Sequence, residues 1–163
     1  MDLVSEFATR IYEPPLSHLR DSGRIADVSN IVCVAMLVVD FETEVAMNGI
    51  VDFIGNSTGR YAGETAFALE MIGCPNAAAA LREILAVATA AGMTHEAIQA
   101  ERSALQPFAI TSFSTLHGSK WDAATGEIDT VFATIDMTSV LSALEAFIDD
   151  HSAIFQEALG DAA

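Results

Sequence analysis

Ser57 lies in the sequence Gly55-Asn56-Ser57-Thr58-Gly59, which matches the G-x-S-x-G pattern of the nucleophile elbow in serine hydrolases. In that elbow the serine sits on a turn between a strand and a helix, and a histidine removes its proton before it attacks a carbonyl carbon. Three histidines follow Ser57 in the chain: His95, His117 and His151. The pattern raises a hydrolase hypothesis, which requires a strand before Ser57 and a parallel sheet around it.

Asp40 and Glu44 form the one carboxylate pair whose spacing could do chemistry, because residues four apart share a face of a helix. An acid–base site or a metal site would need further partners. However, His95-Glu96 is followed by Gln99 where a zinc protease has its second histidine, and no Glu-x-x-His pair of a di-iron bundle occurs. We expect no metal and no cofactor. Asp40 and Glu44 are interpreted as a solvated pair, with Glu44 capping a neighbouring helix end as the alternative.

The segments that must position these residues have the periodicity of helices. Helices are expected over residues 3–12, 16–24, 29–47, 61–72, 75–91, 95–105 and 136–155, the last as one long helix or a broken pair. Helix ends are expected at Pro14-Pro15, Gly23, Asn48-Gly49, Gly73 and Gly92, and helix starts at Pro75, Thr94 and Asp136. Residues 107–126 suggest loops around a short helix.

The apolar segment from Ser29 to Met47 decides the fold class. Its first half is rich in β-branched residues, as in a buried strand, but its second half has a helical period and nothing interrupts it. We therefore predict one buried helix here and an all-α fold. The whole chain is expected to form a single compact domain over residues 1–163, with about seven to nine helices and no significant sheet.

An all-α fold leaves no parallel sheet on which a nucleophile elbow could sit. We therefore expect a structural role for this loop, in which Asn56, Ser57 and Thr58 cap the following helix and Gly59 permits a turn. Glu44 and Asn56 are expected to be largely buried and hydrogen-bonded to the backbone. An enzyme that uses Ser57, or the Asp40 and Glu44 pair, is the less favoured alternative.

Charge is the strongest feature of the composition. The chain has 23 acidic residues and seven Lys and Arg, for a net charge of −16, and residues 121–163 hold nine acids and no Lys or Arg. Such a chain repels nucleic acid and anionic membranes, so we expect neither as a direct ligand. The longest apolar run, residues 31–39, is far shorter than the ~20 residues that a membrane-spanning helix needs.

The remaining sequence signals indicate a cytoplasmic protein. The N-terminal segment has acids early and no basic region, unlike a secretory signal peptide. Cys33 and Cys74 lie in apolar surroundings, which is typical of two reduced thiols in the core. Acidity that serves only solubility is the alternative that the composition leaves open.

The segment that contains Ser57 resembles a bacterial helical domain family whose founding members are DNA-mimic proteins. The resemblance lies in Glu44-Val45, Gly49-Ile50, Phe53-Ile54, Asn56-Ser57, Gly59, Ala68-Leu69 and Ile72-Gly73, and it is strongest over residues 28–92. It implies an all-α fold without catalytic residues. It also implies architectural roles for Glu44, Gly49, Asn56 and Gly59, with Gly49 letting the chain turn and Asn56 fixing the next helix.

The resemblance further implies a function for the charge, because a DNA mimic presents carboxylates where phosphates would sit. We predict a non-enzymatic protein, active in transcription regulation, that occupies the nucleic-acid-binding site of a basic DNA-binding protein. The binding face is expected to consist of Asp129, Asp136, Glu145, Asp149 and Asp150. An immunity-type protein that neutralises another basic protein, a toxin or nuclease, is the alternative, and the sequence leaves open whether the chain forms a homodimer.

Overall fold

Helices account for every regular element in the computed structural model, which describes residues 2–104 and 120–160. The helices are α1 (Leu3–Arg10), α2 (Ser17–Asp21), α3 (Ile31–Asn48), α4 (Ile50–Gly55), α5 (Ala62–Met71), α6 (Pro75–Ala90), α7 (His95–Ser103), α9 (Asp122–Phe132), α10 (Met137–Asp150) and α11 (Ser152–Gly160), with 3-10 turns η1 (Arg24–Ala26) and η2 (Ser57–Tyr61). The described ranges contain no strand, so the predicted all-α class is confirmed. His117 and Asp161 lie outside these ranges.

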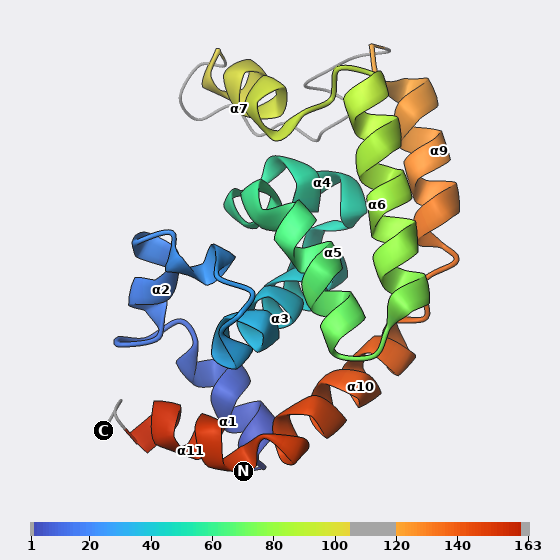
Figure 1. Cartoon of the computed structure of the whole chain (residues 1–163). Helices are drawn as coiled ribbons and strands as arrows, with labels where there is room; N and C mark the ends of the chain where they lie inside the picture. The colour runs from blue at the N-terminus through green and yellow to red at the C-terminus, as the bar shows by residue number, and fades with distance from the viewer. Residues whose placement is uncertain (1, 105–119, 161–163) are drawn as a thin grey trace.

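The central helix is α3, which lies in the middle of the fold (Figure 1). Every residue from Val32 to Phe41 is buried, and α4, α5, α10 and α11 pack around it. The Asn30 side chain caps its start by accepting a hydrogen bond from the Val32 amide at 2.9 Å. The prediction of one buried helix is therefore confirmed, and the β-branched residues of its first half are explained by burial on all sides.

Local sequence signals set several other helix ends as predicted. Thr94 and Asp136 cap α7 and α10 through their side chains, and Pro75 is the first residue of α6. Gly49 ends α3 with φ of 86°, a left-handed conformation that favours glycine. These ends depend on interactions within one turn of the chain, which is why they could be read from the sequence.

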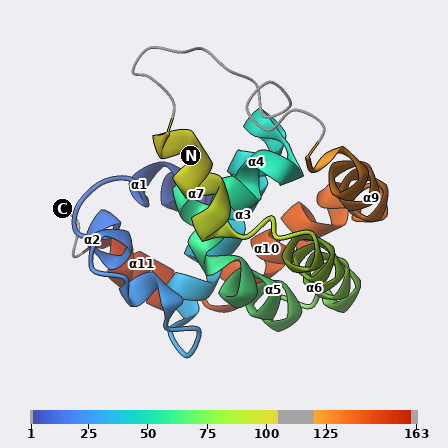
Figure 2. The ribbon, with the colours of Figure 1, turned by 90° about the horizontal axis from the view of Figure 1, so that it is seen from above.

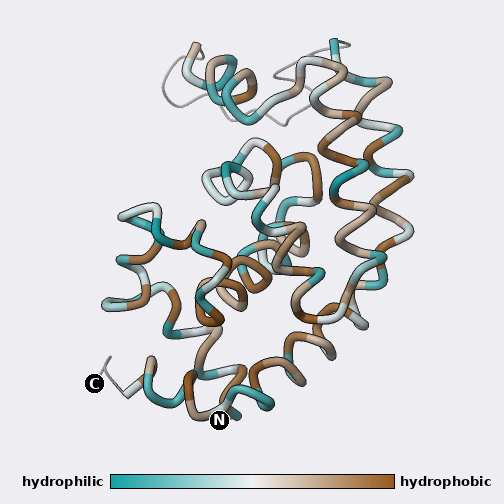
Figure 3. Tube along the Cα trace, in the orientation of Figure 1, coloured by the Kyte–Doolittle hydropathy of each residue, from teal (hydrophilic) through white to brown (hydrophobic). Residues whose placement is uncertain are grey.

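Helix α9 was not predicted, because Gly126 and its neighbouring threonines have weak helix propensity. It lies beside α6 in both views (Figures 1 and 2), with Ala124 and Ile128 buried. Hydrophobic and hydrophilic residues are interspersed along both helices (Figure 3). Packing against α6 therefore stabilises a helix that local propensity does not specify.

The C-terminal segment forms the broken pair that the sequence left open, with α10 and α11 separated at His151. The helical period of residues 136–155 predicts that Leu141, Leu144 and Ile148 face inward. Leu144 and Ile148 are buried, but Leu141 is 38% exposed, so the prediction is wrong at that residue. Phe155 of α11 packs edge-to-face on Phe7 of α1, with ring centroids 4.9 Å apart. The last helix thereby closes over the first.

No single helix in the described ranges is both long and apolar enough to cross a membrane. Two pairs of consecutive helices, α6 with α7 and α9 with α10, have sufficient combined length and hydropathy. The two helices of each pair are bent relative to one another, by 55° and 58° respectively.

Both cysteines are free thiols, but their surroundings differ. Cys33 is 1% exposed and burial raises its pKa to about 11, whereas Cys74 is partly exposed. The thiolate is the reactive form of cysteine. The raised pKa keeps nearly all of the Cys33 thiol protonated near pH 8, so this residue should react slowly. We expect iodoacetamide to label Cys74 alone in the native protein and both residues in denaturant, as measured by mass spectrometry. Equal labelling rates in the native protein would contradict the buried position of Cys33.

Candidate functional site

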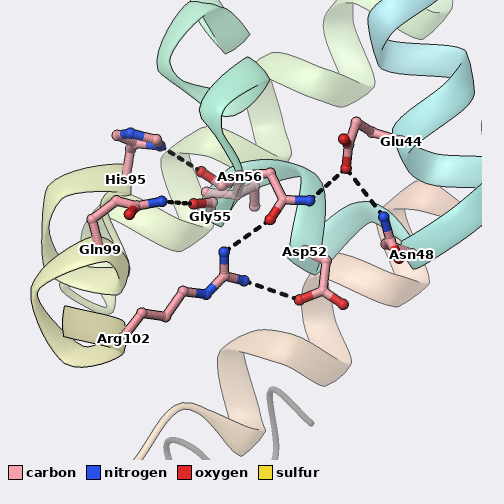
Figure 4. Close-up of polar contacts among 9 residues, drawn as sticks. Glu44, Asn48, Asp52, Gly55, Asn56, His95, Gln99 and Arg102 are labelled. Atoms are coloured by element: carbon pink, nitrogen blue, oxygen red, sulfur yellow. Dashed lines mark hydrogen bonds and ion pairs between the residues drawn. The ribbon is translucent and has the colours of Figure 1, made fainter. Parts of the chain in front are cut away.

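The loop that contains Asn56 is held by a network of side chains (Figure 4). The Asn56 amide nitrogen donates to the Glu44 carboxylate, which also accepts from Asn48 at 3.3 Å. The Asn56 side-chain oxygen, Oδ1, accepts a hydrogen bond from the Arg102 guanidinium at 2.8 Å. Glu44 and Asn56 are half-buried and bonded to side chains, so the expectation of deep burial and backbone partners is wrong.

The same network fastens α7 to the end of α4. His95 Nδ1 donates to the Ile54 carbonyl at 3.1 Å, the Gln99 amide donates to the Gly55 carbonyl, and Arg102 pairs with Asp52 at 3.2 Å. The last carbonyls of a helix lack intrahelical partners, and α7 supplies donors to two of them. No signal in the sequence indicated the roles of Gln99, Arg102 and Asp52, because Arg102 is one of four cations that follow Asn56 in the chain.

Gly59 is required by close packing rather than by a turn. A Cβ atom there would lie 2.2 Å from the Phe53 carbonyl oxygen and 2.3 Å from that of Ile54. The backbone of η2 thus passes directly over the end of α4, at a distance that excludes any side chain. The resemblance implied an architectural role for Gly59. In the structure, this residue allows the η2 backbone to pack closely against the end of α4.

Ser57 and Thr58 do not cap the helix that follows, contrary to expectation. Neither η2 nor α5 has a side-chain cap, Ser57 is exposed, and the Thr58 hydroxyl is buried with no hydrogen-bond partner. The residues before Ser57 form helix α4 instead of a strand. Ser57 and His95 line the same pocket, but no hydrogen bond joins Ser57 to a histidine within residues 2–104 and 120–160. The loop therefore lacks the geometry of a nucleophile elbow.

Asp40 is buried instead of solvated, so its predicted pairing with Glu44 is wrong. Its carboxylate is 6% exposed and accepts two hydrogen bonds from Arg20, from Nη2 at 2.6 Å and Nε at 2.8 Å. Burial raises the pKa of Asp40, and the hydrogen bonds from Arg20 oppose that rise. Asp40 therefore ties α2 to α3 as part of the core.

The predicted binding residues all lie on the surface. Asp129 is on α9, Asp136 caps α10, and Glu145, Asp149 and Asp150 follow along α10; all five are exposed. The Asp136 carboxylate is committed to its cap, because the hydroxyl and amide of Ser139 bond to it and lower its pKa. The other four carboxylates have no hydrogen-bond or ion-pair partner in the part of the chain that the structure describes.

We call the exposed acids of α9, α10, α11 and the Asp136 cap the C-terminal acidic surface: Asp122, Glu127, Asp129, Asp136, Glu145, Asp149, Asp150 and Glu157. The elements that carry it run down one side of the molecule and along its base (Figure 1). The ion pairs between described residues are Arg10–Glu13, Arg20–Asp40, Arg82–Glu70, Arg102–Asp52 and Lys120–Glu101. None of them uses a carboxylate of this surface, so its charge is not neutralised from within.

The Asn56 network gives a stability prediction. Asn56→Ala removes the acceptor of Arg102 and a donor to Glu44 at half-buried positions, which should lower the free energy of unfolding by about 1 to 3 kcal/mol. Asn48→Ala is the matched control, because it removes one longer contact to the same carboxylate from an exposed residue, and it should cost less than about 0.5 kcal/mol. Urea denaturation measures both. Equal effects would show that the network does not stabilise the loop.

Comparison with known proteins gives a match to a protein family. A model of the family described as "DMP19-like protein" matches residues 26–151. This range includes the loop around Asn56, helix α7 and most of the C-terminal acidic surface. Searches of curated proteins and of solved structures found no match.

Proposed function

Because the chain belongs to the DMP19-like family of DNA mimics, we propose that it occupies the nucleic-acid-binding site of a basic DNA-binding protein. The family is not a known enzyme family. In this proposal the chain has no catalytic role, acts on transcription through its partner, and resides with that partner in the bacterial cytoplasm.

The observation that carries the proposal is the segregation of charge. Residues 121–160 carry eight exposed acids and no Lys or Arg, while the ion pairs of the described chain lie within residues 10–120. Acidity that serves only solubility does not require this separation. A surface without internal cations keeps its full field for a basic partner, which it attracts by long-range steering.

The placement of the acids on their helices supports the same conclusion. Asp149 and Asp150 are the last two residues of α10, and Asp129 and Glu157 lie in the C-terminal halves of α9 and α11. Negative charge near a helix C-terminus opposes the helix dipole and costs about 0.3 to 1 kcal/mol at low ionic strength. These carboxylates do not stabilise the helices that carry them, which favours a role in binding.

Spacing along the helices suits a regular array of charges. Glu145 and Asp149 are one turn apart, or about 6 Å along the axis, and Asp122 and Asp129 are two turns apart, or about 10 Å. All four are exposed on rigid helices. A partner that reads a row of phosphates by lysine and arginine could contact such rows without rearrangement of the chain.

Competition with DNA tests the proposal. The immobilised protein should capture a basic DNA-binding protein from bacterial lysate at low salt, and duplex DNA should displace that partner. Capture should weaken steeply as ionic strength rises to about 0.1 M, where the Debye length is ~10 Å. A captured partner that keeps binding DNA while bound to this chain would refute mimicry, and a captured toxin whose inhibition DNA does not relieve would support the immunity function instead.

A further inference from the structure

A pocket of about 560 Å³ lies where the turn η2, helix α7 and the α2–η1 segment meet. This volume falls within the range of small-molecule sites. Arg20 and Asp40 form one wall, and they satisfy each other through two hydrogen bonds. None of the residues of the C-terminal acidic surface lines the pocket, so it is separate from the proposed binding face.

The η2 side of the pocket is rich in hydrogen-bond donors. Ser57, Thr58 and Tyr61 bring three hydroxyls, and Arg60 brings a guanidinium. Arg60 is exposed and makes no ion pair within the described chain, although acids outnumber Lys and Arg by 23 to seven. The Thr58 hydroxyl oxygen is buried without a hydrogen-bond partner, and it is shielded from the solvent that fills the pocket. Ser57, Arg60 and Tyr61 therefore supply the donors that a ligand can reach.

The pocket also offers acceptors. The Gln99 amide nitrogen donates to the Gly55 carbonyl, which leaves its side-chain oxygen available as an acceptor. Asp21 is exposed and has no ion-pair partner among residues 2–104 and 120–160. The pocket therefore combines donors, suited to an anionic group, with acceptors, suited to hydroxyls.

We propose that this pocket binds a phosphate monoester of a small polyhydroxylated molecule, of the sugar phosphate class. A phosphate has three terminal oxygens, which match the Arg60 guanidinium and the hydroxyls of Ser57 and Tyr61 better than the two oxygens of a carboxylate do. The ligand's own hydroxyls would donate to Gln99 and Asp21. The site is a binding site without chemistry, since the described residues hold no activated nucleophile there.

Titration with ribose 5-phosphate, followed by amide shifts in NMR, tests the site. We expect saturable binding with shifts centred on η2 and α7, and an affinity at least about tenfold greater than for ribose or gluconate. Arg60→Ala should weaken binding by about tenfold or more. Arg24→Ala should change it less than about twofold, since Arg24 is also an exposed arginine without an ion pair but does not line the pocket.

Ser57→Ala provides a second and independent test. Ser57 is exposed and lines the pocket, so removal of its hydroxyl should weaken ribose 5-phosphate binding by about fivefold and leave the melting temperature of the free protein unchanged. The proposal fails if the wild type shows no saturable binding up to about 10 mM, or if gluconate or ribose binds as tightly as the phosphate. It also fails if Arg60→Ala and Arg24→Ala weaken binding equally, or if Ser57→Ala leaves the affinity unchanged.

Discussion

Replacing Glu145, Asp149 and Asp150 with Lys should abolish binding to the basic partner while the protein stays folded. The change turns three negative charges of α10 into positive ones at exposed positions. Juxtaposed like charges at an interface cost several kcal/mol, so affinity should fall by more than about a hundredfold. Binding is measured by calorimetry or surface plasmon resonance at low salt with the captured partner.

The fold should tolerate this reversal. Asp149 and Asp150 end α10, where lysine interacts favourably with the helix dipole, and the three carboxylates have no partner in the described chain. The melting temperature should therefore stay the same or rise slightly. A large fall in the melting temperature would show that these acids are structural.

The control reverses three other exposed acids that make no ion pair among the described residues: Asp21, Glu83 and Glu96. It changes the net charge by the same amount, but away from the C-terminal acidic surface. Glu13 is unsuitable because it pairs with Arg10 at 2.9 Å. The control should keep more than about a tenth of the affinity, and equal losses in both triple variants would show that total charge, rather than this surface, determines binding.

Gly59→Ala should destabilise the protein more than the addition of a methyl group at any other glycine that the structure describes. The new Cβ would meet the carbonyl oxygens of Phe53 and Ile54 at 2.2 and 2.3 Å, and both are backbone atoms at the end of α4. The η2 backbone must move to relieve this clash, which should cost about 3 kcal/mol or more and lower the soluble yield. Denaturant unfolding of whatever protein folds gives the loss.

Gly63→Ala is the matched control for this prediction. Gly63 lies in the first turn of α5, four residues from Gly59, and a Cβ there would have nothing within 4 Å. Alanine has the higher helix propensity, so this change should stabilise the protein by up to about 1 kcal/mol. A tolerated Gly59→Ala would contradict the close approach of η2 to α4.

The sequence predicted those parts of the fold that depend on neighbouring residues. Thr94 and Asp136 cap their helices by accepting hydrogen bonds from amides two or three residues away. The apolar segment that forms α3 is uninterrupted, and its second half has a helical period. Partners far apart in the chain were not predicted. Arg20 reaches Asp40 across 20 residues and Arg102 reaches Asn56 across 46, so each pairing exists only once the helices have packed.

The same limit applies to the two candidate sites. Glu145, Asp149 and Asp150 could be chosen because exposed positions follow from the helical period of residues 136–155, although Leu141 shows that this period errs at the edge of a face. The sugar phosphate pocket could not be predicted from one segment. It combines residues of α2, η2 and α7, and its defining groups are those that the folded chain leaves without partners.

The attachment of α7 has a consequence for how the protein opens. Only Ile98 of this helix is fully buried, and the helix is held on α4 by hydrogen bonds to carbonyls and by the Arg102 pair, which water can replace. The ten consecutive buried residues of α3 are held mainly by apolar packing, and water cannot replace those contacts. We therefore expect α7 to detach in a local unfolding event that exposes the carbonyl end of α4 while the core around α3 stays closed (Figure 4).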